Sequence, residues 1–417
     1  MARVEKLGSL DAALVQQPLP LKVRRPRRTA RAERERRVLS VAGLFAGIGG
    51  LELGMARSGH HTKLLCENDA CARAVLDARF PEVPKHGDIR TLERLPKDTS
   101  LVTAGFPCQD LSQAGKTAGI LGSRSGLVGE VFRLLEQSTV PWILLENVPF
   151  MLQLSRGRAM DVIVQGFETL GYRWAYRVVD TRAFGLPQRR ERVFFLASLE
   201  EDPRSVLFAD EAGAPEQEDP AGLACGFYWT EGVRGLGWAV NAVPTLKGGS
   251  TIGIPSAPAI LLPSGEIVKP ALRDLERLQG FQPDWTKPAE AVAKRGYRWK
   301  LVGNAVTVDV AAWIGDRLAR PLPPVNAVGQ RLLPGSAWPR AAWNVGDGRF
   351  CAPLSAWPVR RRGAPLHRFL KDDPELLSAK ATAGFLGRAR TSTLRFPPGF
   401  LASVDAHLRR MQALAAA

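Results

Sequence analysis

Cys108 is the residue with the clearest potential for chemistry in this chain. It follows Phe106 and Pro107 directly, where an apolar run over residues 100–104 passes into a loop rich in Gly and Ser. The apolar run predicts a buried strand, and a strand that ends in this way presents the thiol at the carboxyl edge of an α/β sheet, where such sheets bind ligands. A thiolate there can act as a nucleophile if nearby positive charge lowers its pKa. Most free cysteines are only packing residues, so the rest of the chain must decide between the two roles.

A Gly-rich turn and an acid indicate a nucleotide site at the same edge. A short β run over residues 38–42 enters the turn at 43–54, which would expose backbone N–H groups and a helix N-terminus to a ligand. Glu67 ends a second predicted strand, twenty residues after Gly47. That spacing is typical of an acid that binds ribose hydroxyls. A solvated charge or a cap of the following helix is the alternative role for Glu67.

Further polar residues follow later strands. Asp88, in the loop 86–89, could accept a hydrogen bond from an adenine amino group. Glu146 and Asn147 follow a predicted strand at 142–145 and should reach the same sheet edge.

The formal net charge of +16 is the main signal in the composition. A polyanionic partner is the simplest physical reason to tolerate such self-repulsion, so the charge favours nucleic acid, although a basic tail on an ordinary enzyme would also raise it. Residues 1–37 predict a mostly disordered basic arm. No apolar run approaches the ~20 residues of a membrane span, and no signal peptide is apparent. Five scattered cysteines without a Cys-x-x-Cys pair favour a reduced, cytoplasmic protein without a metal site.

Alternating strands and helices over residues 38–199 predict an α/β class with a doubly wound sheet. Residues 200–220 are acidic and predict a linker or long insert, and 221–270 predict a small irregular β domain. A helix at 271–278 begins a return segment that runs to 319. Residues 320–417 form an extension in which arginines are interleaved with aromatic residues. That pattern fits either nucleic-acid binding or packing on the core.

Five short blocks occur in one order along the chain: 45–50, 107–109, 146–148, 188–192 and 303–306. With these blocks, the chain closely resembles the DNA cytosine-5 methyltransferases over about residues 38–318. The resemblance implies a Rossmann-like S-adenosylmethionine-dependent methyltransferase fold with a smaller, irregular β-rich target-recognition domain. It divides the chain into an arm at 1–37, a catalytic and cofactor-binding domain at 38–199, a target-recognition region at 200–270, a return segment at 271–319 and an extension at 320–417.

The resemblance also implies S-adenosyl-L-methionine as cofactor and methyl donor. The Gly-rich turn would wrap its methionine part, Glu67 would bind the ribose, and Asp88 with Ile89 would bind the adenine. The residues implied as cofactor-binding are Phe45, Gly47, Ile48, Gly49, Gly50, Leu51, Glu67, Asp88, Ile89, Leu127, Asn304, Ala305 and Val306.

Methylation of cytosine at C5 requires particular groups. Addition of the Cys108 thiolate to C6 breaks the aromaticity of the ring and makes C5 an enamine carbon that accepts a methyl group. Glu146, if protonated, would neutralise charge at N3, and either Arg190 or Arg192 would do so at O2. The resemblance favours Arg192. The cytosine must be flipped out of the duplex.

A second group of residues is expected at the DNA substrate. Asn147 would orient Pro107 and the loop around Cys108, and Thr245 with Leu246 is similar to a Thr-Leu pair of the family's recognition region. The full set is Pro107, Gln109, Asn147, Thr245 and Leu246.

Double-stranded DNA is the expected partner, the chain is expected to act as a monomer, and a restriction endonuclease for the same site would be a partner in the cell. Three other functions remain open. A tRNA cytosine-5 methyltransferase is disfavoured because the Cys-Phe-Thr element of those enzymes is absent. A catalytically idle DNA-binding regulator is disfavoured by the intact Cys108, Glu146 and Arg192. An NAD-dependent oxidoreductase is more distant. The recognised DNA sequence and the base that removes the C5 proton cannot be read from the chain.

Overall fold

The protein is described by a computed structural model that covers residues 36–106, 126–216, 218–249, 257–325 and 328–416. Pro107, Cys108, Gln109 and most of the expected basic arm lie outside these residues. Arg36 and Arg37, which we expected to belong to that arm, are part of the folded structure. The Arg37 guanidinium donates to the carbonyl of Leu318 and lies 5.1 Å from the ring centroid of Trp142. These two residues therefore belong to the folded part of the chain.

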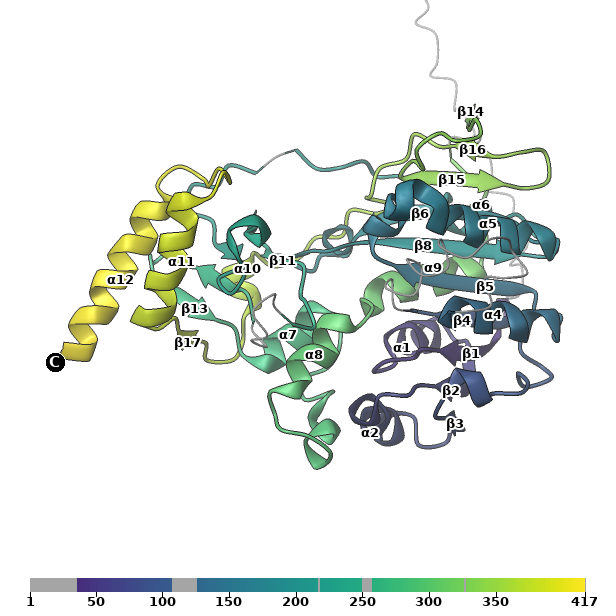
Figure 1. Ribbon diagram of the computed structural model, residues 1–417, viewed down its shortest axis with the longest axis horizontal. Helices are drawn as coiled ribbons and strands as arrows, with labels where there is room; N and C mark the ends of the chain where they lie inside the picture. The colour runs from purple at the N-terminus through teal and green to yellow at the C-terminus, as the bar shows by residue number, and fades with distance from the viewer. Residues whose placement is uncertain (1–35, 107–125, 217, 250–256, 326–327, 417) are drawn as a thin grey trace, which may run out of the picture. The chain divides into compact units, whose positions relative to one another are not determined.

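A large mixed sheet forms the first part of the structure (Figure 1). Its order is β14-β16-β15-β6-β8-β5-β4-β1-β2-β3, with parallel pairing from β3 to β5 and antiparallel pairing from β5 to β14. The strands are β1 Ser40–Leu44, β2 His61–Cys66, β3 Lys85–His86, β4 Leu101–Ala104, β5 Trp142–Asn147, β6 Arg173–Asp180, β8 Glu191–Ser198, β14 Gln330–Arg331, β15 Ala341–Asn344 and β16 Phe350–Cys351.

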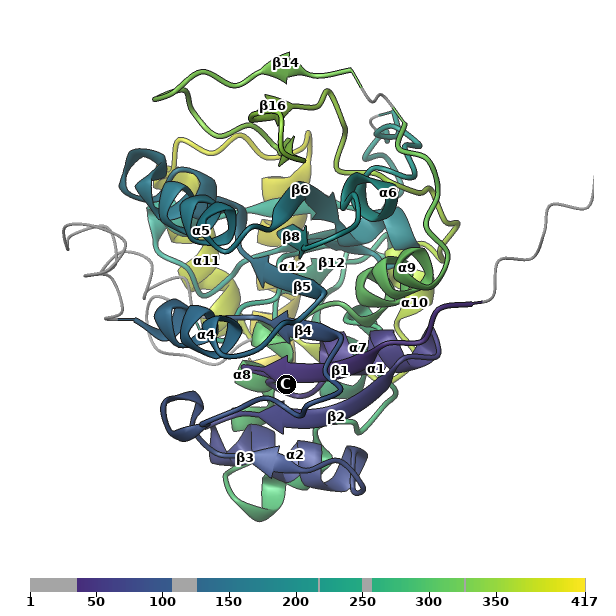
Figure 2. The ribbon, with the colours of Figure 1, turned by 90° about the vertical axis from the view of Figure 1, so that its right-hand side faces the viewer.

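Helices cover both faces of this sheet (Figure 2). Val102 and Ile143 pack with α4 (Leu127–Glu136) and α5 (Arg158–Thr169), whereas their chain neighbours Leu101 and Leu144 pack with α1 (Gly50–Arg57) and α9 (Val308–Ala319). Successive strand residues point to opposite faces, so near-continuous apolar runs are what a two-sided sheet requires. Helix α2 (Ala70–Arg79) also belongs to this part, and it is capped by Asp69, whose carboxylate accepts from the N–H groups of Cys71 and Ala72.

A smaller antiparallel sheet, ordered β10-β9-β12-β13-β17, forms the second part. Ile260 and Val268 pack with α7 and α8 on one face, and Ala259 and Ile267 pack with α11 and α12 on the other. The elements are β9 Cys225–Phe227, β10 Trp238–Val240, β12 Ala259–Leu261, β13 Ile267–Lys269, β17 Glu375–Leu376, α7 Leu272–Leu278, α8 Tyr297–Asn304, α11 Ala379–Thr391 and α12 Phe400–Ala416. A two-strand parallel pair, β7 (Gln188–Arg189) with β11 (Val243–Pro244), joins the segments that lead into the two parts.

Short helical segments complete the described chain. They are α6 Arg204–Leu207, α10 Leu366–Phe369, η1 Ile89–Thr91, η2 Pro149–Leu152, η3 Leu154–Gly157, η4 Thr181–Phe184, η5 Val233–Gly235 and η6 Lys287–Ala291. Helix α6 falls inside the acidic stretch expected to be a linker, where Val206, Leu207 and Phe208 are buried in the core of the large sheet. Across the described ranges, no helix has the length and apolarity needed to cross a membrane, and no cluster of three or more His, Cys, Asp or Glu could hold a metal ion.

The extension beyond residue 320 contributes to both sheets. Strand β15 pairs with β6, placing Ala341 opposite Arg177, and β17 pairs with β13. Trp343 and Phe385, two of the aromatic residues expected to contact either nucleic acid or the core, are buried. Both side chains therefore pack in the core, which is the second of the two expected roles.

A buried carboxyl group lies beneath the Gly-rich turn. Glu52 on α1 is 1% exposed, accepts a hydrogen bond from Thr103 Oγ1 at 2.8 Å, and packs so closely on Gly43 that a Cβ there would lie 2.3 Å from its Oε1. Burial raises the pKa of Glu52 from 4.5 to about 7. The protonated form is therefore the one that the folded state accommodates.

We predict that Glu52→Gln reduces the pH dependence of stability. Because the folded pKa is raised, the stabilisation is complete below pH 4.5 and is lost as the pH rises through about 7. The free energy of unfolding of the wild type should thus fall by up to about 3 kcal/mol over this window relative to the variant. Urea denaturation between pH 5 and pH 8 measures this difference, and parallel curves for the two proteins would contradict it.

We also predict that Phe385→Ala destabilises the small sheet. Phe385 is 1% exposed and packs between Phe227, Phe396 and Phe400, so its truncation should cost about 3–5 kcal/mol. The matched control is Leu414→Ala on α12, where the side chain is 57% exposed and the expected change is below about 0.5 kcal/mol. Equal urea midpoints for the two variants would show that the extension is not part of this core.

Candidate cofactor and catalytic site

The Gly-rich turn between β1 and α1 has a backbone that few residues can adopt. Phe45, Gly47 and Gly49 have positive φ angles of 53°, 56° and 81°. Gly50, the first residue of α1, has a different constraint, because a Cβ there would lie 2.5 Å from the carbonyl oxygen of Val306. The turn is thus pressed against the segment that returns from the far end of the chain.

Glu67 at the end of β2 holds the turn in place. Its Oε2 accepts from the backbone N–H of Gly47 at 2.8 Å, and its Oε1 accepts from the backbone N–H of Asp69 at 2.8 Å. A carboxylate has further lone pairs for a ligand hydroxyl after these two bonds. The position of Glu67 beside the turn is therefore compatible with the ribose contact expected of it.

A cavity of about 250 Å³ lies between the turn and the return segment. Of the residues expected to bind the cofactor, all but Gly49 line it; a Cβ at Gly49 would instead meet the ring of Phe80 at 2.4 Å. Asp88 at the cavity is paired with Arg90, which is the main reason that its pKa falls to about 2. Its carboxylate is consequently ionised and a permanent hydrogen-bond acceptor.

The cavity also has lining residues that the sequence reasoning missed. These are Ala46, Cys66, Asn68, Asp69, Ala72, Gly105, Glu146, Lys300 and Leu301, of which Glu146 was expected only as a catalytic group. Lys300 lies four residues before Asn304 in α8 and therefore on the same helix face, a spacing that could have identified it. Its Nζ is 2.7 Å from Tyr297 Oη and 3.5 Å from Asp69 Oδ2.

The buried Glu146 and the partly exposed Arg192 form an ion pair at this cavity. Glu146, on β5, is 7% exposed, and Arg192 Nε on β8 is 3.0 Å from its Oε1. Burial raises the pKa of Glu146, and the positive charges of Arg192 and Arg190 oppose this rise without cancelling it. A Cβ at Gly105, which follows β4, would lie 3.6 Å from Glu146 Oε2. The carboxyl group therefore faces the stretch that leads into Pro107 and Cys108.

Arg190 was expected to share the catalytic role, but its guanidinium lies elsewhere. The side chain is 1% exposed and donates to the backbone carbonyls of Leu246, Gly303 and Ala305 at 2.7–3.2 Å. Burial lowers the pKa of Arg190 well below its usual range. This geometry indicates that Arg190 holds these backbone segments together and does not contact a substrate.

The expected substrate residues within the described ranges hold backbone segments together. Asn147 Nδ2 donates to the carbonyl of Phe106 at 3.1 Å, which fixes the residue immediately before Pro107. Thr245 Oγ1 donates to the carbonyl of Arg189 at 2.9 Å, and the Leu246 N–H donates to Gln188 Oε1 at 3.2 Å. Pro107, Cys108 and Gln109 lie outside the described residues, so their placement is not part of this geometry.

The cavity fits S-adenosylmethionine in its chemistry. It combines a Gly-rich turn, a carboxylate at the spacing for a ribose, an ionised acceptor at Asp88 and apolar walls from Ile89, Leu127 and Val306. Two other cysteines are poor nucleophiles: burial of Cys66 at the cavity and of Cys225 in the small sheet raises the pKa of each thiol to about 12.

We predict that Gly50→Ala weakens binding of S-adenosylhomocysteine at least 10-fold. The added methyl group must displace the Val306 backbone, which lines the cavity and cannot move as a flexible side chain would. Gly171→Ala is a control, since nothing lies within 4 Å of a Cβ there and its strain comes only from a φ of 80°. Calorimetric titration measures both, and unchanged affinity in Gly50→Ala would contradict the placement of the cofactor.

Comparison with known proteins agrees with this site. The model of the C-5 cytosine-specific DNA methylase family matches residues 39–223. Type II methyltransferase M2.BsuMI of Bacillus subtilis (strain 168) is 47% identical over 381 residues, which cover 88% of this chain and 97% of that protein. Type II methyltransferase M.BsuFI of Bacillus subtilis is 38% identical over 183 residues, 44% of each chain, and Type II methyltransferase M.MspI of Moraxella sp is 27% identical over 304 residues, 68% of this chain and 71% of that one. The chain therefore belongs to the C-5 cytosine-specific DNA methylase family and is a methyltransferase that uses S-adenosyl-L-methionine.

Proposed function

We propose that this enzyme methylates C5 of a cytosine flipped out of a specific duplex DNA sequence, through a covalent bond between Cys108 and C6 of the base. The observation that carries the proposal is the Glu146–Arg192 pair at the cofactor cavity, in which the buried Glu146 lies on β5, next to the strand β4 that leads into Cys108. A protonated carboxyl and a guanidinium are the two groups that addition to a cytosine ring needs at N3 and O2.

The first half of the reaction uses three side chains. The Cys108 sulfur forms a bond to C6, and the electron pair displaced from the ring is taken up as Glu146 donates its proton to N3. Arg192 stabilises the charge at O2. Because burial raises the pKa of Glu146, this carboxyl holds its proton at a higher pH than an exposed one would.

The second half restores the base and the enzyme. When bound, S-adenosylmethionine would supply an electrophilic methyl group; C5 forms its bond to this methyl group as the methyl–sulfonium bond breaks, which leaves S-adenosylhomocysteine. A base, for which water would suffice, then removes the C5 proton. The electron pair of that C–H bond re-forms the ring double bond and expels the Cys108 thiolate, while the N3 proton returns to Glu146. Every bond made at C6 is thus broken again.

Other residues of the site would position these groups. Asn147 would fix the start of the Cys108 loop through the carbonyl of Phe106, and Arg190 would hold Leu246 against the return segment. Thr245 and Leu246, expected at the substrate, would act at this joint. Pro107 and Gln109 remain proposed substrate contacts on the strength of their motif.

The target sequence would be read by the part of the chain built on the small sheet. The region proposed from sequence was 200–270; its strands β9, β10, β12 and β13 form one sheet with β17 of the extension, which pairs with β13. The names of the relatives support a Type II restriction-modification role, with a restriction endonuclease acting on the same site. We further propose that the enzyme works as a monomer in the cytoplasm.

We predict that Cys108→Ser abolishes methyl transfer while binding of S-adenosylhomocysteine stays within about twofold of the wild type. Transfer of radiolabelled methyl groups to duplex DNA, with tRNA as a second substrate, measures activity, and bisulfite sequencing locates the modified base. Cys225→Ser is the control and should remain active, because that thiol is buried in the small sheet. Methyl transfer by Cys108→Ser at the wild-type rate would overturn the nucleophile, and transfer to tRNA alone would overturn the substrate.

A further inference from the structure

The indole of Trp285 is bound to the Gly-rich turn. Its Nε1 donates to the carbonyl of Ile48 at 2.9 Å, although the two residues are 237 positions apart in the chain. Ile48 is 1% exposed, lies between the two positive-φ glycines Gly47 and Gly49, and lines the cofactor cavity. Trp285 itself does not line the cavity, so it touches the turn from the protein side.

The ring of Trp285 is held on several sides. Phe80 and Phe281 pack against it with ring centroids 6.2 and 5.3 Å away, and the guanidinium of Arg79 lies 5.1 Å from its centroid. Arg79 Nε also donates to the backbone carbonyl of Trp285 at 3.0 Å. Phe80 and Phe281 are the rings that a Cβ at Gly49 or Gly50 would meet. The indole and the turn therefore share one packed cluster.

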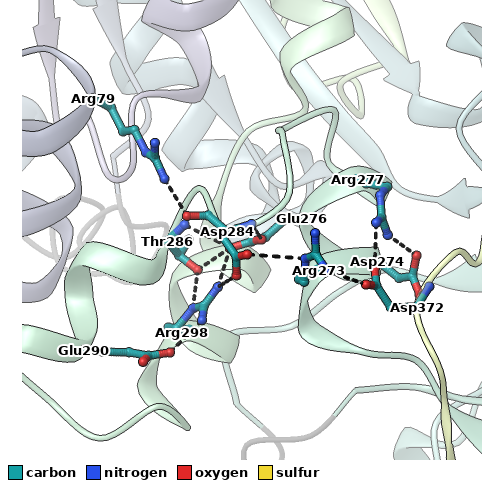
Figure 3. A network of polar contacts seen from close by, with 10 residues as sticks. All are labelled: Arg79, Arg273, Asp274, Glu276, Arg277, Asp284, Thr286, Glu290, Arg298 and Asp372. Atoms are coloured by element: carbon teal, nitrogen blue, oxygen red, sulfur yellow. Dashed lines mark hydrogen bonds and ion pairs between the residues drawn. The ribbon is translucent and has the colours of Figure 1, made fainter.

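A buried ion pair fixes the residues on both sides of Trp285 (Figure 3). Glu276 on α7 is fully buried and accepts from the backbone N–H groups of Asp284 and Thr286. Arg298 on α8 donates to Glu276 Oε1 at 3.0 Å and to Thr286 Oγ1 at 2.8 Å. Because a buried charge pair of this kind is costly to break, the backbone at Trp285 has little freedom to move.

We propose that Trp285 is a positioning residue for S-adenosylmethionine, which preorganises the cofactor turn by holding the Ile48 carbonyl. The proposal rests on the placement of the cofactor at that turn. Without the N–H donor, the turn must order itself when the cofactor binds, and that ordering weakens affinity. The rate of the chemical step at saturating cofactor is not affected, since Trp285 contacts none of the groups at Glu146.

Trp285→Phe tests the proposal, because phenylalanine keeps an aromatic ring and removes only the N–H donor. Loss of one hydrogen bond should raise the Kd for S-adenosylhomocysteine about 5- to 10-fold in calorimetric titration. The KM for S-adenosylmethionine should rise in parallel, and kcat at saturating cofactor should stay within twofold. Arg79→Met, an exposed position that leaves the buried pair intact, should raise the same Kd about twofold.

Trp313→Phe is the matched control. The Trp313 indole is 2% exposed and donates to Asp210 Oδ2 at 2.7 Å, away from the cavity. This variant should lose thermal stability with its Kd unchanged. If Trp285→Phe behaves like Trp313→Phe, or lowers kcat at saturating cofactor, the positioning role is wrong.

Comparison of the wild type with Gly50→Ala shows whether a negative result concerns the positioning role of Trp285 or the location of the cofactor site. If it binds S-adenosylhomocysteine and Gly50→Ala does not, the cavity is the cofactor site and the Trp285→Phe result judges the positioning role alone. If Gly50→Ala and Trp285→Phe both bind as the wild type does, the cofactor lies elsewhere and both proposals fail.

Discussion

One buried guanidinium joins the segments that must meet for this enzyme to have an active site. Arg190 gives its hydrogen bonds to the carbonyls of Leu246, Gly303 and Ala305, which come from two segments more than fifty residues further along the chain. Removing such a charge from water is expensive, and only several well-placed acceptors offset the cost. With them in place, β7 and the return segment are fixed relative to each other. The cavity wall formed by Asn304, Ala305 and Val306 depends on that joint.

The same constraint explains how the carboxyl group of Glu146 and the guanidinium of Arg192, the two groups proposed to be catalytic, come to meet. Arg190 and Arg192 lie two residues apart around the start of β8, yet one is directed at backbone carbonyls of the joint and the other at Glu146. The short parallel pair of β7 with β11 sets the first direction, and the antiparallel register of β8 with β5 sets the second. A single five-residue block thus fastens the two parts of the molecule and supplies the proposed contact to the base.

Sequence reasoning located the strand ends well, and its errors have physical causes. The turn predicted at 43–54 is shorter in the structure, because β1 runs to Leu44 and α1 begins at Gly50. Its glycines and the acid at Glu67 nevertheless depend on local chain geometry, which residue spacing encodes directly. Lys300 shares a helix face with Asn304, but its meeting with Asp69 in the cavity depends on the packing of α8 beside α2, a long-range contact that no local pattern reveals. The different roles of Arg190 and Arg192 could not be predicted for the same reason. The two residues have the same charge, and only their partners in the folded chain distinguish them. In the extension, the mixture of aromatic residues and arginines around Trp343 and Phe385 fitted both nucleic-acid binding and packing on the core. Only the burial of the two side chains in the structure decides between these roles.

The pairing of β17 with β13, and the packing of α11 and α12 beneath it, bears on how readily this enzyme could change its specificity. A recognition module that is continuous in sequence can be exchanged between relatives as one cassette. Here the proposed recognition unit is assembled from two stretches of the chain, which are separated by the return segment and by the strands β14, β15 and β16 of the large sheet. A chimera that exchanged only residues 200–270 would place a foreign sheet against the resident helices. An exchange of specificity would therefore have to include the segment after β16, with β17, α11 and α12, together with residues 200–270.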